Sequence, residues 1–237
     1  MAAMKLTRAL LLGGSVLIAP ACVPVVTPEQ VFSQASRSVV MLYAAETSGK
    51  IVGRGSGVFV DDDLLVTNCH VIARGKIFQV GHRQKRSPAR LMAYDADNDL
   101  CVLKVQGLDV MPARIGDAGS VRVGQRVYAI GTPEGFELTL SEGLVSGLRE
   151  AASGRYIQTT APMSDGSSGG GLFDGNGCLI GITAFVFSAG QNLNFAAPVD
   201  WAVDLAKQAS RAGSEGPADP IQLPPALAKQ WRHPLLK

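Results

Sequence analysis

A succession of short apolar or alternating runs between Ser38 and Pro198 limits what this 237-residue chain can fold into. The runs are rich in Val, Ile, Leu, Tyr and Phe, and Gly, Asp and Asn residues separate them, as is typical of β-strands joined by turns. Because no helical periodicity intervenes, the pattern predicts an all-β sandwich or barrel. Only "DWAVDLAKQASRAG" differs. It predicts a helix over residues 200–213 that is capped by Asp200 and closed by Gly213.

Residues 1–21 have the composition of a secretory signal. Lys5 and Arg8 precede an apolar run, and small residues lead to Cys22. Cleavage after "APA" fits ordinary signal peptidase, whereas the cysteine that follows resembles a bacterial lipobox, in which Cys22 is lipidated and anchors the chain to the membrane. Both interpretations predict export, either to the bacterial periplasm or to a membrane anchor that faces it.

The remaining sequence outside the strands gives little sign of a charged partner. Residues 22–36 form an N-terminal segment, and the proline-rich residues 214–237 are expected to be an extended tail. The chain has 22 Lys and Arg against 20 Asp and Glu residues, and Lys5 and Arg8 account for the excess. This balance predicts no nucleic-acid partner. The basic run at residues 81–90 is interpreted as a solvated hairpin tip.

Three cysteines besides Cys22 lie in apolar, strand-like runs and are predicted to be buried thiols: Cys69, Cys101 and Cys178. An odd number cannot pair completely, and a Cys101–Cys178 disulfide is a possibility that nothing in the spacing supports. Zinc-finger spacing is absent, and no second histidine lies near Cys69 in the sequence. No metal site is therefore predicted.

Among the three histidines, His70 has the setting of a functional residue, since in "GSGVFVDDDLLVTNCHVI" two strands and an acidic turn deliver it to a strand end. Asp99 stands immediately before the run "LCVLKV", where a half-buried carboxylate can point at an imidazole. Asp95 and Asp97 lie further out in the turn and are expected to be solvated. Ser168 follows in "DGSSGGG", so that the order His70, Asp99, Ser168 is the chymotrypsin order of a serine triad.

These residue types suit acyl transfer. A serine hydroxyl needs a base to remove its proton, His70 can act as that base near neutral pH, and Asp99 would fix the tautomer of the imidazole. The oxyanion that develops needs preorganised donors, for which the backbone N–H groups of Gly166 and Ser168 are placed. "GSSGG" also matches the nucleophile elbow of α/β-hydrolases. That elbow requires a helix after the serine and a later Asp and His, and this sequence continues with glycines and a strand.

Taken in order, "GSGVFV…LLVTNCHVI", "DADNDLCVLKV", "YAIGTPEGFELTLSEGLVSGL", "IQTTAPMSDGSSGGGLFDGNGCLIGI" and "LNFAAP" resemble the trypsin-like peptidase domain of the HtrA (Deg) family. The resemblance implies two six-stranded β-barrels, over residues 37–112 and 113–199, with the triad between them. It also implies cofactor-free cleavage of protein and peptide substrates, in protein quality control or regulated proteolysis. Relatives usually continue into PDZ domains, which the short tail is not expected to supply.

The resemblance also places a substrate pocket. Its wall would be Leu193, Asn194 and Phe195, and its base would include Pro162 and Met163. No acidic residue is expected at the base, so a preference for small or medium aliphatic side chains before the cut is predicted. The alternative to an enzyme is a trypsin-like module with impaired catalysis that binds peptides as a membrane-tethered adaptor. The sequence does not indicate an oligomeric state.

Overall fold

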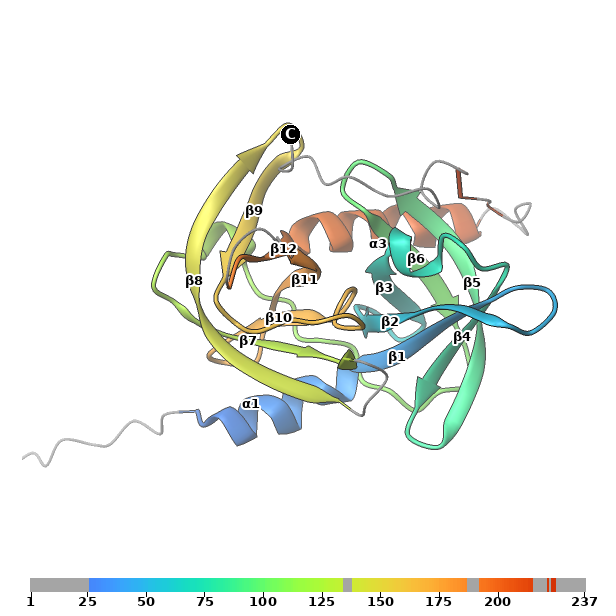
Figure 1. Ribbon diagram of the computed structural model, residues 1–237, viewed down its shortest axis with the longest axis horizontal. Helices are drawn as coiled ribbons and strands as arrows, with labels where there is room; N and C mark the ends of the chain where they lie inside the picture. The colour runs from blue at the N-terminus through green and yellow to red at the C-terminus, as the bar shows by residue number, and fades with distance from the viewer. Residues whose placement is uncertain (1–25, 134–137, 187–191, 215–220, 222, 225–237) are drawn as a thin grey trace, which may run out of the picture.

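The computed structural model describes residues 26–133, 138–186, 192–214, 221, 223 and 224. The predicted signal and Cys22 therefore lie outside the described residues, as does most of the proline-rich tail. Twelve strands make up two sheets, each of which closes into a barrel (Figure 1). The prediction of an all-β fold with two six-stranded barrels is confirmed.

The first barrel contains strands β1 to β6, and every pair of neighbours in it is antiparallel. Around the barrel the order is β1-β2-β3-β6-β5-β4, so that β3 and β6, which are far apart in the sequence, pair directly. Buried aliphatic side chains such as Leu42, Leu65 and Leu103 fill its interior. The bounds are β1 Val39–Ala45, β2 Ile51–Phe59, β3 Leu64–Asn68, β4 Ile77–His82, β5 Lys85–Asp95 and β6 Leu100–Val105.

The second barrel has the order β10-β11-β12-β9-β8-β7. Val127, Ile157 and Leu172 are among the buried residues of its interior. The bounds of its strands are β7 Arg126–Gly131, β8 Thr139–Ala151, β9 Gly154–Thr159, β10 Gly171–Asp174, β11 Leu179–Val186 and β12 Asn194–Pro198.

The basic run at residues 81–90 lies in the β4–β5 hairpin of the first barrel, as predicted.

The C-terminal helix connects the two barrels. Helix α3 (Val199–Ser214) leaves the second barrel and packs on β5 and β6 of the first (Figure 1). A single buried apolar cluster runs from the first barrel through α3 into the second, and it includes Leu100, Leu205 and Tyr156. The ring of Tyr156 also meets Trp201 of α3 edge-on, with centroids 5.1 Å apart. The relative placement of the barrels is therefore set by packing.

Both predicted ends of α3 are wrong by one residue, and Gly213 lies within the helix, which ends at Ser214. The helix begins at Val199, directly after β12, so that Asp200 lies in its first turn and is not the N-cap. Because Pro198 still belongs to the strand, no turn residue separates strand from helix. Asp200 places an acidic group near the helix N-terminus. Burial and the neighbouring Asp117 and Asp204 raise the pKa of its carboxyl group.

Three shorter helices and one helical turn complete the fold. Helix α1 (Pro28–Ala35) has a capping box, in which the Thr27 hydroxyl accepts from Gln30 N–H and the Gln30 side chain accepts from Thr27 N–H. It lies within the segment for which the sequence predicted no element. Helix α2 (Cys69–Ile72) is a single turn at the end of β3. The others are the 3₁₀ helices Ser36–Ser38 and Ala118–Ser120.

Candidate active site

The structure brings His70 and Asp99 together at one end of the first barrel. His70 lies in α2, immediately beyond β3, and Asp99 lies immediately before β6, which pairs with β3. The Nδ1 atom of His70 is 2.5 Å from Oδ2 of Asp99, and the backbone N–H of His70 donates to Oδ1 at 2.9 Å. Asp99 is completely buried, whereas the His70 side chain keeps 35% of its surface exposed. The carboxylate can therefore orient an imidazole that remains open to solvent.

The turn before β6 explains why Asp99 takes this place. The Asp95 carboxylate accepts hydrogen bonds from the backbone of Asp97 and from the backbone and side chain of Asn98, so it closes the turn upon itself. Asp99 then adopts a left-handed conformation, with φ at 55°, which aspartate tolerates better than most residues. Its carbonyl accepts from Cys69 N–H at 3.1 Å and from the Asn68 side chain at 3.0 Å. Backbone and side chain of Asp99 are both bound to the segment that carries His70.

Ser168 lies in the loop between β9 and β10 and is joined to the first barrel. Its carbonyl accepts from Ser56 N–H of β2 at 2.9 Å. Gly169 packs so closely on the end of β3 that a Cβ atom there would collide with the Ser56 carbonyl and the Thr67 hydroxyl and would lie 3.2 Å from Asn68 N. Gly169 also has φ at 82°. Ser168 is thus held against the strand end from which His70 follows. Its hydroxyl donates to the Ala184 carbonyl at 3.3 Å.

The loop before Ser168 leaves two N–H groups unused. Ser167 N–H donates to the Ser164 carbonyl at 2.9 Å, and Gly166, with φ at 90°, occupies the third position of this turn, where a positive φ is needed for type II geometry. Gly169 N–H donates to the Thr183 carbonyl. Among the described residues, the N–H groups of Gly166 and Ser168 donate to no acceptor. These are the two donors that the sequence singled out for an oxyanion.

Ser56 and Thr132 support this loop, and sequence reasoning missed both. The Ser56 hydroxyl donates to the Gly166 carbonyl at 2.7 Å and accepts from Thr132 N–H at 2.8 Å, and both side chains are buried. Thr132 follows β7, so one hydroxyl links the two barrels and the loop. The signal that could have identified Ser56 is a single hydroxyl residue between two glycines, just before the apolar end of a strand, because a buried hydroxyl needs partners.

The cysteine prediction is wrong for two of the three residues. Cys69 and Cys101 form a disulfide, and Cys178 is free and half-buried. The pairing depends on the register of β3 against β6, in which Thr67 lies opposite Cys101, and short motifs in the sequence do not reveal that register. The disulfide joins the residue before His70 to the second residue after Asp99. Burial and nearby Asp174 raise the pKa of the Cys178 thiol, which lowers its reactivity near neutral pH.

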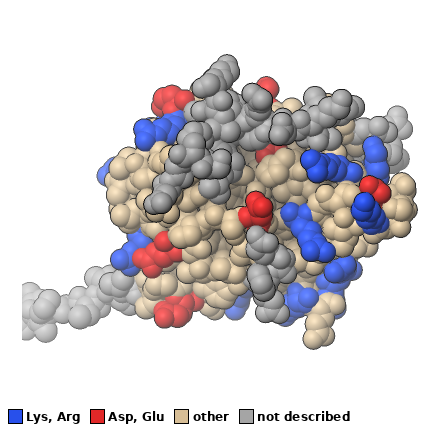
Figure 2. Space-filling model, in the orientation of Figure 1, with Lys and Arg blue, Asp and Glu red and all other residues tan. Residues whose placement is uncertain are grey.

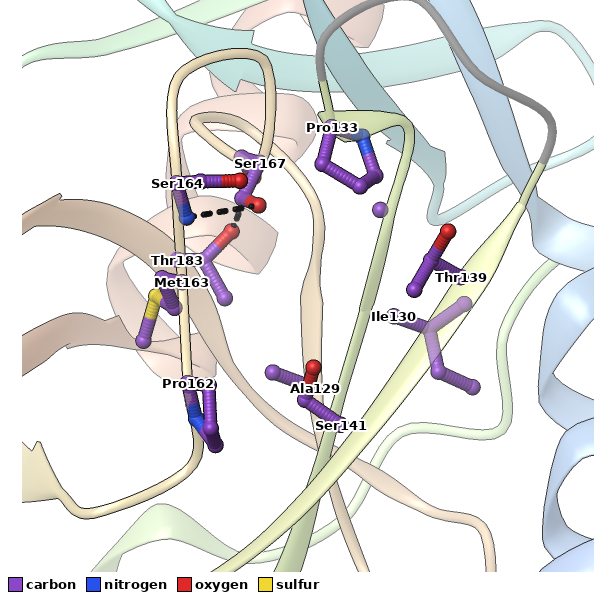
Figure 3. Close-up of a pocket in the computed structure, with 11 residues that line it drawn as sticks. Ala129, Ile130, Pro133, Thr139, Ser141, Pro162, Met163, Ser164, Ser167 and Thr183 are labelled. Carbon is purple, nitrogen blue, oxygen red and sulfur yellow. Dashed lines mark hydrogen bonds between the residues drawn. The ribbon is translucent and has the colours of Figure 1, made fainter.

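A cavity of about 160 Å³ lies behind the loop that carries Ser168, between that loop and strands β7 and β8 (Figure 3). Pro162, Met163 and Ser167 line it, and Figure 3 shows the Ser167 hydroxyl and carbonyl bonded to Ser164 N–H and the Thr183 hydroxyl. Of the predicted pocket residues, only Pro162 and Met163 belong to this cavity. The other three, Leu193, Asn194 and Phe195, lie at or in β12 and do not line it.

Asn194 nevertheless connects the two parts of the predicted pocket. Its side chain is buried and donates to the carbonyl of Ala161, the residue before Pro162, at 2.8 Å. In the part of the chain that the structure describes, no three His, Cys, Asp or Glu side chains gather closely enough to hold a metal ion.

Comparison with known proteins agrees with this geometry. Residues 55–182 match the family model of the trypsin-like peptidase domain. The chain belongs to this family. It is 39% identical to the chloroplastic Protease Do-like 5 of Arabidopsis thaliana, over 67% of this chain and 57% of that protein. It is 34% identical to a probable periplasmic serine endoprotease DegP-like of Pseudomonas putida, over 67% of this chain and 35% of that protein.

Solved structures of proteases are also similar to this chain. The HtrA-type protease AlgW with a tripeptide superposes with a TM-score of 0.70 at 30% identity, over 77% of this chain and 63% of that one. The serine endoprotease from Yersinia pestis also gives 0.70, at 29% identity, over 78% of this chain and 67% of that one. These relatives and solved structures thus bear the names of Do-like, DegP-like and HtrA-type serine proteases. The chain spans about a third to three fifths of the length of the relatives compared by sequence.

We predict that the Cys69–Cys101 disulfide stabilises the first barrel. It closes a loop of sequence separation 32, for which the chain-entropy model gives about 3–4 kcal/mol. The double variant Cys69→Ala/Cys101→Ala should lose about this much free energy of unfolding in urea titrations. Wild type with reductant should lose a similar amount, and the double variant should not respond to reductant. Cys178→Ala is the matched control. Equal midpoints for oxidised and reduced wild type would contradict the prediction.

Proposed function

We propose that the protein is a serine endopeptidase that cleaves peptide bonds through an acyl-enzyme, with Ser168 as nucleophile, His70 as general base and acid, and Asp99 as the residue that orients His70. Two features together carry the proposal. The buried Asp99 carboxylate is hydrogen-bonded to His70, and two unused N–H groups flank a serine loop that packs on the strand end from which His70 follows. The similarity to HtrA-type and DegP-like proteases supports it.

The proposed reaction begins with proton transfer. With its Nδ1 proton held by Asp99, the imidazole of His70 has Nε2 as its basic nitrogen, which takes the Ser168 proton as Oγ attacks the carbonyl carbon. The Ser168 hydroxyl must first leave the Ala184 carbonyl. The buried Asp99 carboxylate then stabilises the imidazolium, which returns the proton to the leaving amine.

The tetrahedral intermediate carries a negative charge on the former carbonyl oxygen. In the proposal, Gly166 N–H and Ser168 N–H stabilise it, and each such donor contributes about 3–4 kcal/mol in enzymes of this type. The donors must be in place before the reaction, and this is the role that we assign to the hydrogen bonds of Ser56. Water then attacks the acyl-enzyme by the same steps in reverse order.

The assignment of Ser168 predicts covalent labelling by a fluorophosphonate probe. Wild type should react, and Ser168→Ala should not. His70→Ala should lower the labelling rate by about a thousandfold or more, because the hydroxyl then has no base. Asp99→Asn, which preserves the shape of the side chain, should lower it by about 10³–10⁴-fold through the wrong imidazole tautomer. Labelling kinetics followed by gel fluorescence provide the measurement.

Ser167→Ala is the matched control for the labelled residue, since mass spectrometry should still place the probe on residue 168 in that variant. Circular dichroism and the unfolding midpoint establish that each variant is folded. Equally weak labelling of folded wild type and Ser168→Ala would contradict the peptidase proposal and favour the peptide-binding adaptor.

For the residue before the cut, we propose a preference for small or medium aliphatic side chains. The base and the wall of the predicted substrate pocket are joined by the Asn194–Ala161 hydrogen bond. None of the five residues assigned to this pocket is acidic: Pro162, Met163, Leu193, Asn194 and Phe195. A library of peptides that varies only this residue should give its highest kcat/KM with Ala, Val or Leu. The profile of Asn194→Gly should extend to larger apolar side chains, since the buried amide is removed. A profile dominated by Arg or Lys would contradict the proposal.

We further propose that the protein is exported, on the strength of its N-terminal sequence and of the periplasmic DegP-like relatives. None of the described helices has the length and apolar character needed to cross a membrane. Mass spectrometry of the mature protein should show an N-terminus at Cys22, either free or with added lipid mass. A free amine without lipid would rule out the lipid anchor, and an intact Met1 or Met4 terminus would rule out cleavage.

A further inference from the structure

From the edge of strand β2 we propose a specificity determinant for the leaving-group side of the substrate: Arg54 recognises an acidic side chain two or three residues after the cleaved bond. The inference rests on the proposed peptidase function and adds a substrate class to it. Its elements are an unpaired length of strand beside Ser168, an arginine on that length and the charge of the surrounding surface.

The first element is the free edge of β2. The strand pairs with β1 from Ile51 to Val58, but with β3 only at Val58 and Phe59. Ser56 directs its N–H away from β1, to the Ser168 carbonyl. Alternate residues of a strand direct their backbone groups to the same edge, so the N–H and carbonyl of Arg54 also face away from β1. Among the described residues, neither group of Arg54 is hydrogen-bonded.

The second element is the direction of the substrate. In the proposed pocket, side chains before the cut lie against the second barrel, near Pro162 and Asn194. The chain must then pass Ser168 and continue over the first barrel. Arg54 lies two residues from Ser56, which is about 7 Å along the strand. An extended segment that leaves Ser168 can therefore pair with the edge at Arg54, in the manner of an added strand.

Helix α2 lies along the same path. A Cβ atom at Gly55 would lie 2.7 Å from the Val71 side chain and 3.1 Å from the Ser168 carbonyl. Both Val71 and the loop of Ser168 therefore pack against β2 at Gly55. Val71 is the neighbour of His70. The edge at Arg54 is therefore continuous with the site and is not a remote surface.

The third element is charge. Arg54 is exposed and has no ion-pair partner among the described residues. Tyr43 lies opposite it on β1, and the guanidinium of Arg86 stacks 4.3 Å from the centre of the Tyr43 ring. Gly81, which pairs with Arg86 and has no side chain, leaves room for this contact. We call Arg54, Tyr43 and Arg86 the basic ledge.

The surroundings of the basic ledge are also basic. Figure 2 shows Lys and Arg side chains gathered over the part of the molecule that the first barrel forms. The acidic residue of the β1–β2 hairpin, Glu46, accepts from the Ser48 hydroxyl at the hairpin end. On this barrel the exposed basic side chains outnumber the exposed acidic ones, which favours an acidic substrate side chain. Exposed basic residues of this barrel are Lys50, Arg54, Arg74, Lys76, Arg83, Lys85, Arg86 and Arg90.

The test uses peptides that are identical except for Asp, Asn or Lys at the first, second and third residues after the cut. Wild type should prefer Asp to Asn by about twofold to fivefold in kcat/KM at the second or third residue, as expected for one exposed ion pair. The preference should reside mainly in KM and should weaken between 50 and 500 mM salt, roughly as screening requires. Arg54→Gln should abolish it, and Arg54→Glu should favour Lys.

Arg155→Glu, which changes an exposed arginine of β9 on the other barrel, is the matched control and should retain the wild-type preference. Unchanged ratios in both Arg54 variants would overturn the inference. Binding of the same peptides to Ser168→Ala, measured by fluorescence polarisation, tests the basic ledge without catalysis. Equal affinities for the Asp and Lys peptides would also overturn the inference. Failure of wild type to cleave any peptide or to react with the probe would instead contradict the peptidase function.

Discussion

The hydrogen bonds of Ser56 join the two barrels at the place where the candidate site lies. Its N–H binds the Ser168 carbonyl, its hydroxyl donates to the Gly166 carbonyl, and Thr132 of the second barrel donates to the same hydroxyl. All of these groups are buried or half-buried, so leaving one without a partner would cost about 1–3 kcal/mol. The loop conformation, the two unused N–H groups and the position of Ser168 all depend on this contact.

A second set of polar contacts holds the other half of the site. Asp99 is fully buried, and its backbone and side chain bind the segment from Asn68 to His70. Next to it, the Asn98 side chain accepts from the hydroxyl of Tyr156 of the second barrel, whose pKa is raised by burial. The barrels are therefore connected by hydrogen bonds on both sides of the candidate triad, while α3 and the shared apolar cluster set their separation.

Local patterns in the sequence were sufficient to predict the all-β class and to single out candidate residues for the site. Alternating apolar runs predict strands because burial of one face has a period of two. His70 and Ser168 were recognisable because each lies in an unusual setting, at a strand end or among glycines. Asp99 was separable from Asp95 because a residue directly before a buried strand is drawn into the interior. The helix start at Val199 was missed, since no capping residue marks a helix that continues directly from a strand.

What the sequence determined by itself was the all-β character, most of the strands and the chemical character of single positions, because these depend on neighbours along the chain. The tertiary structure decided everything that depends on register and on contact between barrels: the Cys69–Cys101 disulfide, the role of Ser56 and the free edge at Arg54. Each arises where β2, β3 and β6 meet residues from distant parts of the chain. Strand pairing has no local code, so only the closed barrels could place these groups together.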